Sequence, residues 1–248
     1  MTVKDIVIDS SGRRLHGRLF TPSETGSLPA VLICHGYNGC REMFFGYCQY
    51  LAEHGIAAMA ITFCGGSTRD ESGFPSTSMT MMTERDDAIA GIEYLRNLPY
   101  TDQNRVFLFG ESMGGLAGTM AAAELGSRIA GLFLLYPAFC IAPDWQERFP
   151  NADDLPETIE FWGLKLGKPY LLGLREFDVY DLMPRVTVPV IIFHGHKDAI
   201  VPVSYARRAA NAFPVSRLML FPEEGHGFSP VSGGIVIGEV GKAVLTIS

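Results

Sequence analysis

The chain has 248 residues, of which 47% are hydrophobic and 19% are charged, and its formal net charge is −7. This length and composition are typical of one globular domain with a core large enough to need neither disulfides nor metals. The acidic balance and the lack of a Lys/Arg cluster argue against nucleic acid as a partner.

The five cysteines form no regular pattern, because their number is odd and no Cys-x-x-Cys spacing occurs. We therefore expect free thiols in a reducing compartment, with neither a disulfide framework nor a structural zinc site. The N-terminus lacks the apolar segment of a secretory signal, and no apolar run reaches the roughly 18 residues of a membrane span. The sequence predicts a cytoplasmic protein without metal, cofactor or membrane span, and leaves a homodimer as one option.

The predicted strands begin with a pair at residues 3–8 and 14–20, joined by a turn at Ser10-Ser11-Gly12. Six further runs are short and almost wholly apolar, as expected for strands buried on both faces of a mostly parallel sheet. They cover residues 30–34, 57–63, 105–109, 129–136, 190–194 and 217–221.

Helical patterns alternate with these strands. The clearest has Ala88, Ile92 and Leu95 at helical spacing and Pro99 just past its end. The predicted helices cover residues 43–54, 83–98, 113–125, 204–212 and 231–248, although four glycines weaken the last of them. The alternation predicts an α/β fold in which helices flank the sheet and ligands bind at the carboxyl ends of the strands.

One connection is much longer than the others. About fifty residues separate the strand ending near residue 136 from the one beginning near residue 190, whereas ordinary connections are far shorter. We interpret residues 138–185 as a cap inserted after the sixth strand, within a single domain over 1–248. The segment is rich in aromatic residues: Phe139, Trp145, Phe149, Phe161, Trp162, Tyr170, Phe177 and Tyr180.

The motif Gly110-Glu111-Ser112-Met113-Gly114 directly follows the predicted strand 105–109 and directly precedes the alanine-rich helix 113–125. Gly-x-Ser-x-Gly between a strand and a helix is typical of a nucleophile elbow. Glycine is needed because side chains at 110 and 114 would collide with neighbouring backbone, and the helix N-terminus favours developing negative charge. The pentapeptide alone is common by chance, but this setting predicts Ser112 as a nucleophile.

A serine hydroxyl needs a base, and the base needs a third group to fix its tautomer. His226 follows the last predicted strand and Asp198 follows the one before it, so both should reach the sheet edge that carries Ser112. Their order along the chain, Ser, Asp, His, fits a strand–turn–helix elbow. For Asp198 the alternative is a cap or turn aspartate. The other histidines are predicted to be structural or to lie in loops: His16, His35, His54, His194 and His196.

The segment His35-Gly36-Tyr37-Asn38-Gly39 follows the predicted strand 30–34, at the position of an oxyanion-hole loop. The predicted donors are the backbone N–H groups of Tyr37 and Met113. Each such donor is typically worth about 3 kcal/mol in the transition state. The alternative is a simple turn between a strand and a helix.

Together these motifs resemble the α/β-hydrolase superfamily of serine esterases over nearly the whole chain. His35-Gly36-x-x-Gly39, Gly110-x-Ser112-x-Gly114, Asp198 and Gly225-His226 stand in the order of that superfamily. The resemblance implies an α/β-hydrolase fold: a mostly parallel central sheet flanked by helices, with the inserted cap after the sixth strand.

A narrower resemblance is to bacterial cinnamoyl (feruloyl) esterases, on the size of the chain, the short loop at Tyr37 and the insert. In that family the insert supplies polar groups that hold the phenolic hydroxyl. The resemblance implies that Asp144 and Tyr170 bind the phenol; the alternatives are a helix cap for Asp144 and a packed core aromatic for Tyr170. Met113 departs from the family, in which Gln is common at this position.

The sequence therefore predicts a serine carboxylic-ester hydrolase that acts through an acyl-enzyme on a small-molecule ester, and the resemblance points to hydroxycinnamoyl esters. Three alternatives stay open. The same chemistry could serve an acylaminoacyl or prolyl-type peptidase or an acylglycerol lipase, and the fold could serve a catalytically inactive binding module.

Overall fold

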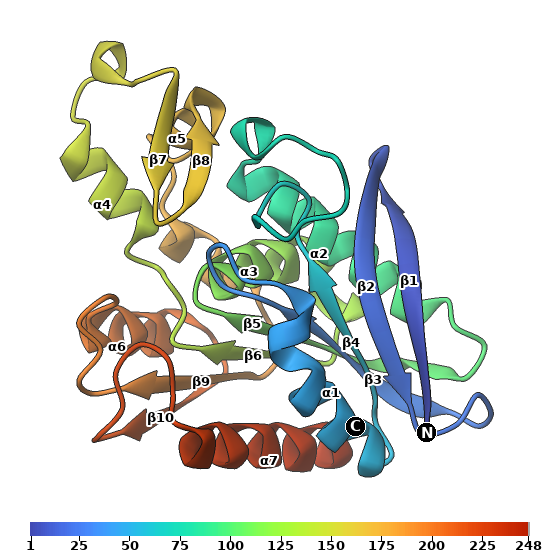
Figure 1. Ribbon diagram of the computed structural model, residues 1–248. Coiled ribbons are helices and arrows are strands. Elements are labelled where there is room, and N and C mark those ends of the chain that lie inside the picture. Colours follow the sequence, from blue (N-terminus) through green and yellow to red (C-terminus); the bar gives the residue numbers. More distant parts are fainter. Residues whose placement is uncertain (248) are drawn as a thin grey trace.

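The computed structural model describes residues 1–247. Eight strands form one sheet in the order β1-β2-β4-β3-β5-β6-β9-β10 (Figure 1). Strand β2 runs opposite to the other seven, so it pairs antiparallel with β1 and β4, and all remaining pairs are parallel. The mostly parallel sheet, with the insert after its sixth strand, confirms the predicted fold class. The strands are β1 (Thr2–Ser10), β2 (Arg13–Thr21), β3 (Leu28–Cys34), β4 (Ala57–Thr62), β5 (Thr101–Glu111), β6 (Gly131–Leu135), β9 (Val190–Gly195) and β10 (Ser216–Phe221).

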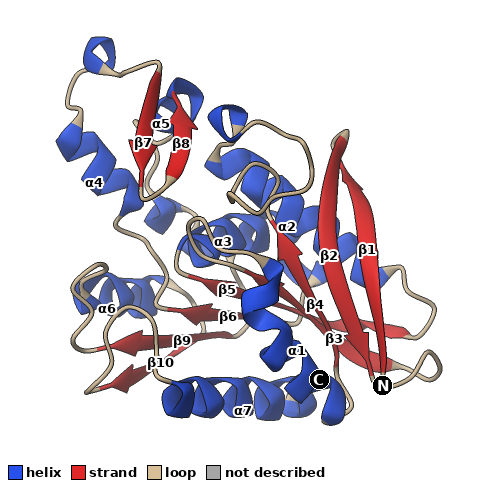
Figure 2. Cartoon of the chain, in the orientation of Figure 1, coloured by secondary structure: helices blue, strands red, loops and turns tan. Residues whose placement is uncertain are grey.

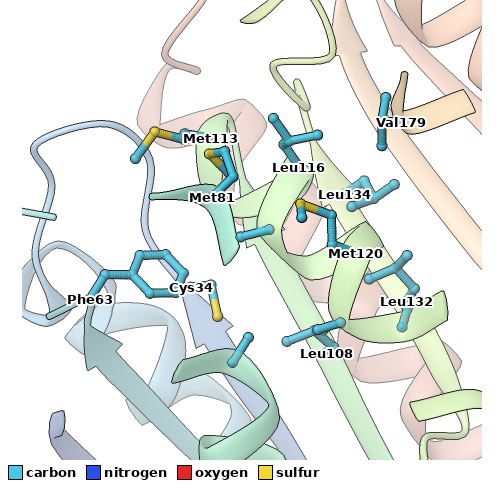
Figure 3. Packing of buried hydrophobic residues seen from close by; sticks show 14 of the residues in the cluster. Cys34, Phe63, Met81, Leu108, Met113, Leu116, Met120, Leu132, Leu134 and Val179 are labelled. Atoms are coloured by element: carbon cyan, nitrogen blue, oxygen red, sulfur yellow. The ribbon is translucent and has the colours of Figure 1, made fainter. Parts of the chain in front are cut away.

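Helices cover both faces of the sheet, as Figure 2 shows. On one face α2, α3 and α6 share a buried apolar cluster with the sheet, and on the other face α1 and α7 share a second cluster. Figure 3 shows part of the first cluster, where Leu116 and Met120 of α3 face Leu134 and Leu132 of β6. The helices are α1 (Phe45–Glu53), α2 (Met81–Arg96), α3 (Met113–Leu125), α6 (Val203–Ala212) and α7 (Pro230–Thr246).

The predicted helices are confirmed with small shifts at their ends. The segment predicted over 43–54 begins with a 3-10 turn at Arg41–Phe44 and is α-helical only from Phe45. Helix α2 begins two residues earlier than predicted, because the side chains of Thr80 and Thr83 each accept a hydrogen bond from the backbone N–H of the other residue.

The final helix forms in spite of its glycines, and Gly233 shows what one of them does. A Cβ at this position would lie 2.8 Å from the hydroxyl oxygen of Tyr47, so glycine allows α7 to approach α1 closely. The predicted end of this helix, Ser248, lies outside the described residues.

The insert between β6 and β9 carries its own secondary structure. It contains α4 (Ile141–Arg148), the antiparallel hairpin β7 (Thr158–Phe161) and β8 (Leu164–Gly167), and α5 (Lys168–Gly173). Figure 1 shows this insert in yellow, at the end of the molecule toward which the arrowheads of β6 and β9 point. Among residues 1–247, no helix combines the length and the apolar character that a bilayer crossing requires.

Candidate active site

Ser112 lies in a sharp turn between β5 and α3, with φ 50° and ψ −116°. Few residues other than glycine adopt a positive φ, so this strained turn must be held by its surroundings. The Ser112 N–H donates to the carbonyl oxygen of Leu135 (2.9 Å). A Cβ on Gly110 would overlap the carbonyl oxygen of Gly114, and a Cβ on Gly114 would overlap that of His35. The two glycines therefore have the steric role that the motif predicts.

The structure brings Ser112, His226 and Asp198 together at the carboxyl edge of the sheet. Asp198 follows β9 and His226 follows β10. The Oγ atom of Ser112 lies 3.0 Å from Nε2 of His226, and Nδ1 of His226 lies 2.8 Å from Oδ2 of Asp198. Because a carboxylate only accepts hydrogen bonds, the imidazole proton lies on Nδ1, and Nε2 is left to accept the serine proton.

Asp198 is held as an ionised carboxylate. Burial would raise its pKa, but hydrogen bonds from His226 and from the amides of Val201 and Ile200 outweigh burial, and its pKa lies below the ordinary value. Its Oδ1 atom accepts the N–H groups of Ile200 (2.9 Å) and Val201 (2.8 Å), which fixes the carboxylate in the loop. The aspartate therefore both caps this turn and orients His226.

The neighbouring His194 is a packed residue. Its side chain is fully buried, and Nε2 lies 2.9 Å from the carbonyl oxygen of Val201 and 3.5 Å from Oδ2 of Asp198. Burial lowers its pKa, so the ring is neutral near pH 7 and donates to the carbonyl. His194 therefore lies against Asp198, and among residues 1–247 it forms no hydrogen bond with Ser112.

The peptide between Gly36 and Tyr37 is fixed through its carbonyl group. Its carbonyl oxygen, on Gly36, accepts the Gly39 N–H (3.0 Å) and lies 2.7 Å from Nδ1 of His35. Nε2 of His35 accepts the Phe63 N–H (3.0 Å), so the single ring proton is on Nδ1 and donates to Gly36. Burial lowers the pKa of His35 to about 4, which keeps the ring neutral.

The two predicted oxyanion donors are the backbone N–H groups of Tyr37 and Met113. In a trans peptide the N–H points opposite the carbonyl, so that of Tyr37 points away from the fixed Gly36 oxygen. Met113 is the first residue of α3, and its N–H has no partner within the helix. Among the backbone hydrogen bonds of turns, loops and caps in residues 1–247, none has the N–H of Tyr37 or Met113 as its donor.

Ser112 opens into a cavity of about 330 Å³ between the sheet edge and the insert. The insert supplies most of the apolar wall, and Tyr37 and Met113 line the cavity from the sheet side. Its aromatic and charged lining residues from the insert are Trp145, Phe161, Trp162, Tyr170, Asp144 and Arg148. Throughout the described part of the chain, no group of three or more His, Cys, Asp or Glu side chains is arranged to hold a metal ion.

Asp144 and Tyr170 both line this cavity. Asp144 is exposed in the first turn of α4, whose N-cap is Cys140, so the alternative of a helix cap is wrong. Tyr170 is only 1% exposed, and its hydroxyl donates to Sδ of Met113 (3.6 Å). Tyr170 is therefore a packed aromatic residue that also faces the cavity.

Sequence reasoning missed Arg148, which lines the cavity four residues after Asp144. Its guanidinium lies 5.2 Å from the ring centroid of Trp145, within the range of a cation–π contact. The four-residue spacing places both charged side chains on the same face of α4. That spacing was the signal available in the sequence.

Comparisons with known proteins show the family and the fold of this chain. The model of the prolyl oligopeptidase family matches residues 43–235. An uncharacterized protein of Mycobacterium tuberculosis is 28% identical over 246 residues, which cover 98% of this chain and 79% of that protein. The uncharacterized peptidase YtmA of Bacillus subtilis is 23% identical over 200 residues, which cover 79% and 74%.

A solved structure shares the fold. Est1E from Butyrivibrio proteoclasticus, solved with ferulic acid bound, matches with a TM-score of 0.84 at 24% identity, over 96% of each chain. At this identity the likeness establishes the architecture. Together with the family match over most of the chain, it leads to one conclusion: this protein belongs to the prolyl oligopeptidase family and is a hydrolase of the α/β-hydrolase fold.

Proposed function

We propose that the protein is a serine esterase that works through an acyl-enzyme. Ser112 Oγ attacks the ester carbonyl carbon while His226 Nε2 takes its proton, and Asp198 stabilises the imidazolium. The imidazolium then protonates the leaving alkoxide. A water molecule, deprotonated by the same histidine, releases the acid and restores Ser112.

The N–H groups of Tyr37 and Met113 hold the oxyanion in this proposal. Two observations support these donors: the carbonyl of the Gly36–Tyr37 peptide is fixed, and Met113 lies in the first turn of α3, where its N–H has no partner within the helix. Donors that are already oriented cost no reorganisation as the charge develops, which is why such sites contribute strongly. An ester is the easier substrate, because its alkoxide leaves with less assistance than an amine.

The acyl group in this proposal is aromatic, of the hydroxycinnamoyl type. The cavity volume lies near the lower end of the range for ligand sites, roughly 300–1,000 Å³, which favours a compact group over a long acyl chain. Aromatic side chains line the cavity, and Asp144 supplies a carboxylate that can accept a hydrogen bond from a phenolic hydroxyl. The bound ferulic acid of Est1E, a protein of the same fold, supports this choice of acid.

A second candidate is a peptidase that cleaves aminoacyl amides, and the match to the prolyl oligopeptidase family favours it. Both candidates use the same hydrogen-bonded chain from Ser112 to Asp198. They differ in the leaving group, and therefore in the ratio of activity on esters to activity on anilides.

The observation that carries the proposal is the chain of hydrogen bonds from Asp198 through His226 to Ser112, which ends at an aromatic cavity. The test is a panel of methyl ferulate, methyl cinnamate, p-nitrophenyl butyrate, a long-chain p-nitrophenyl ester and an aminoacyl anilide. We expect methyl ferulate and the short ester to be turned over best, and Ser112→Ala to remove all turnover while the protein stays folded. Faster turnover of the anilide would favour the peptidase.

The inactive binding module is tested separately. A fluorophosphonate reacts with an activated serine whatever substrate the enzyme prefers. We expect stoichiometric labelling at Ser112. An unlabelled, folded protein would reject the enzyme and favour the module.

A further inference from the structure

The carboxylate of Glu111, the residue before Ser112, joins two segments that lie far apart in the sequence. Its Oε2 atom accepts the Gly36 N–H (3.0 Å), and its Oε1 atom accepts the Tyr136 hydroxyl (2.7 Å). Glu111 is not among the residues that line the cavity. Its side chain is therefore positioned to act on other residues of the site and not on the substrate.

On one side, Glu111 holds the loop that carries the proposed oxyanion donor. Gly36 is the first residue of the peptide whose N–H belongs to Tyr37, and the carbonyl of that peptide is held by His35 and Gly39. Glu111 fixes the other end of Gly36. A Cβ on Gly36 would lie 3.2 Å from Glu111 Oε2 and 3.0 Å from Ser112 Cβ, so glycine lets the loop, Glu111 and Ser112 approach without crowding.

On the other side, Glu111 holds the aromatic ring against which His226 lies. Tyr136 follows β6 with φ 34°, is buried, and places its ring centroid 4.6 Å from that of His226 and 5.2 Å from that of Phe228. Burial and the charge of Glu111 both raise the pKa of Tyr136, so its hydroxyl stays protonated and donates. The hydrogen bond from the Tyr136 hydroxyl to Glu111 therefore fixes the orientation of the Tyr136 ring, which packs against the imidazole of His226.

We propose that Glu111 is a positioning residue that couples the oxyanion loop to the general base, a role that rests on the proposed function. One carboxylate satisfies two donors that would otherwise have no acceptor in the site. Removing it frees Gly36 and Tyr136 together, so the donor of Tyr37 and the base His226 both lose their fixed geometry. Misplacement by about 1 Å can cost about 100-fold in rate.

The variants separate this coupling from simple support of the fold. Glu111→Ala removes both acceptors, whereas Glu111→Gln retains an oxygen for Gly36 and an amide that can donate to the oxygen of Tyr136. Tyr136→Phe removes one of the two bonds. Glu53→Ala and Tyr50→Phe are the matched controls, since both residues lie on α1, outside the site.

The kinetic experiment measures kcat and KM on p-nitrophenyl butyrate. We expect Glu111→Ala to lower kcat about 10- to 100-fold with KM within about twofold, and Glu111→Gln to recover most of the loss. The double variant Glu111→Ala/Tyr136→Phe should be no slower than Glu111→Ala, because both changes break one network. Any of three results would overturn the proposal. The kcat of Glu111→Ala could be close to that of wild type, the losses of Glu111→Ala and Tyr136→Phe could add fully in the double variant, or Glu111→Gln could be as slow as Glu111→Ala.

A second readout does not depend on which substrate the enzyme prefers. The Nδ1–H proton shared by His226 and Asp198 should give a downfield proton NMR signal, which Ser112→Ala retains and Asp198→Ala abolishes. We expect Glu111→Ala to shift or broaden this signal, and Glu53→Ala to leave it unchanged. If wild type hydrolysed no ester but Glu111→Ala still changed this signal, the proposed function would fail and the positioning role would stand. If Glu111→Ala left the signal unmoved, the positioning role would be overturned.

Discussion

Replacing Asp198 by asparagine tests the proposed acid by changing little except one hydrogen-bonding atom. Asparagine has the same shape, and its oxygen can still accept the N–H groups of Ile200 and Val201. The amide NH2 then faces Nδ1 of His226, where the carboxylate oxygen stood at 2.8 Å. A donor now meets a donor, so the imidazole must carry its proton on Nε2 instead.

The cost follows from that tautomer. With the proton on Nε2, 3.0 Å from Ser112 Oγ, the histidine can no longer accept the serine proton as the hydroxyl attacks. We expect kcat to fall by about 10⁴-fold, which corresponds to about 5.5 kcal/mol of transition-state stabilisation. KM should change little, because Asp198 is not among the residues that line the cavity.

The assay is steady-state hydrolysis of p-nitrophenyl butyrate, with thermal unfolding measured on the same samples. Asp198→Asn should keep a higher Tm than Asp198→Ala, because alanine leaves two backbone N–H groups without an acceptor. Asp178→Asn makes the same chemical change at a carboxylate that accepts the Tyr180 N–H outside the cavity, and it should retain full activity. An Asp198→Asn variant within about tenfold of wild type would refute the tautomer argument.

Three further predictions concern the packing of the fold and the lining of the cavity. Gly110→Ala should destabilise the protein by about 2–3 kcal/mol or more, because its Cβ would overlap the Gly114 carbonyl, whereas Gly234→Ala, in open space on α7, should stabilise it by about 0.5–1 kcal/mol in urea unfolding. Glu84 is fully buried without a hydrogen-bond partner, and burial raises its pKa well above 4.5. Above pH 4.5 this carboxyl ionises in the unfolded chain but stays neutral in the folded protein, so wild type should lose stability as the pH rises toward the folded pKa, by up to about 1.4 kcal/mol per pH unit. Glu84→Gln should therefore gain stability relative to wild type between pH 5 and pH 8, and parallel curves for the two proteins would contradict a neutral Glu84. Asp144→Ala should raise KM for methyl ferulate about tenfold and leave methyl cinnamate, which lacks the phenol, nearly unchanged; equal effects on both would remove Asp144 from phenol binding.

The sequence predicts the regular elements well where the signal is local. The apolar runs predict six of the eight strands of the main sheet, and the turn at Ser10-Ser11-Gly12 marks the other two. Helix α3 has the bounds predicted for it, residues 113–125. The motif of the elbow is local, because Gly110 is required by the backbone of Gly114 within the same turn. Gly114, in contrast, is required by the backbone of His35, which only folding brings close. Chain order after successive strands was enough to select His226 and Asp198 from the other candidates.

The insert was predicted as a segment but not in its details. The hairpin of β7 and β8 has only four residues in each strand, and short strands give little periodic signal. It is held by contacts with distant parts of the chain. The Tyr37 hydroxyl donates to the Phe161 carbonyl, and a Cβ on Gly167 would overlap the Thr77 carbonyl.

By itself, the sequence determined where the main strands and the elbow lie, because these depend on residues close to them in the chain. It also selected the three residues proposed for acyl transfer, from the elbow motif and from chain order after successive strands. Only the tertiary structure decided how the site is held and shaped. Ser112 and His226 are 114 positions apart, and Gly36 and Glu111 are 75 apart, so their distances follow from how the strands pair and not from any local pattern. Folding brings these distant residues together, and only then do three features form: the bridge made by Glu111, the fixed peptide at Gly36 and the cavity beside Arg148.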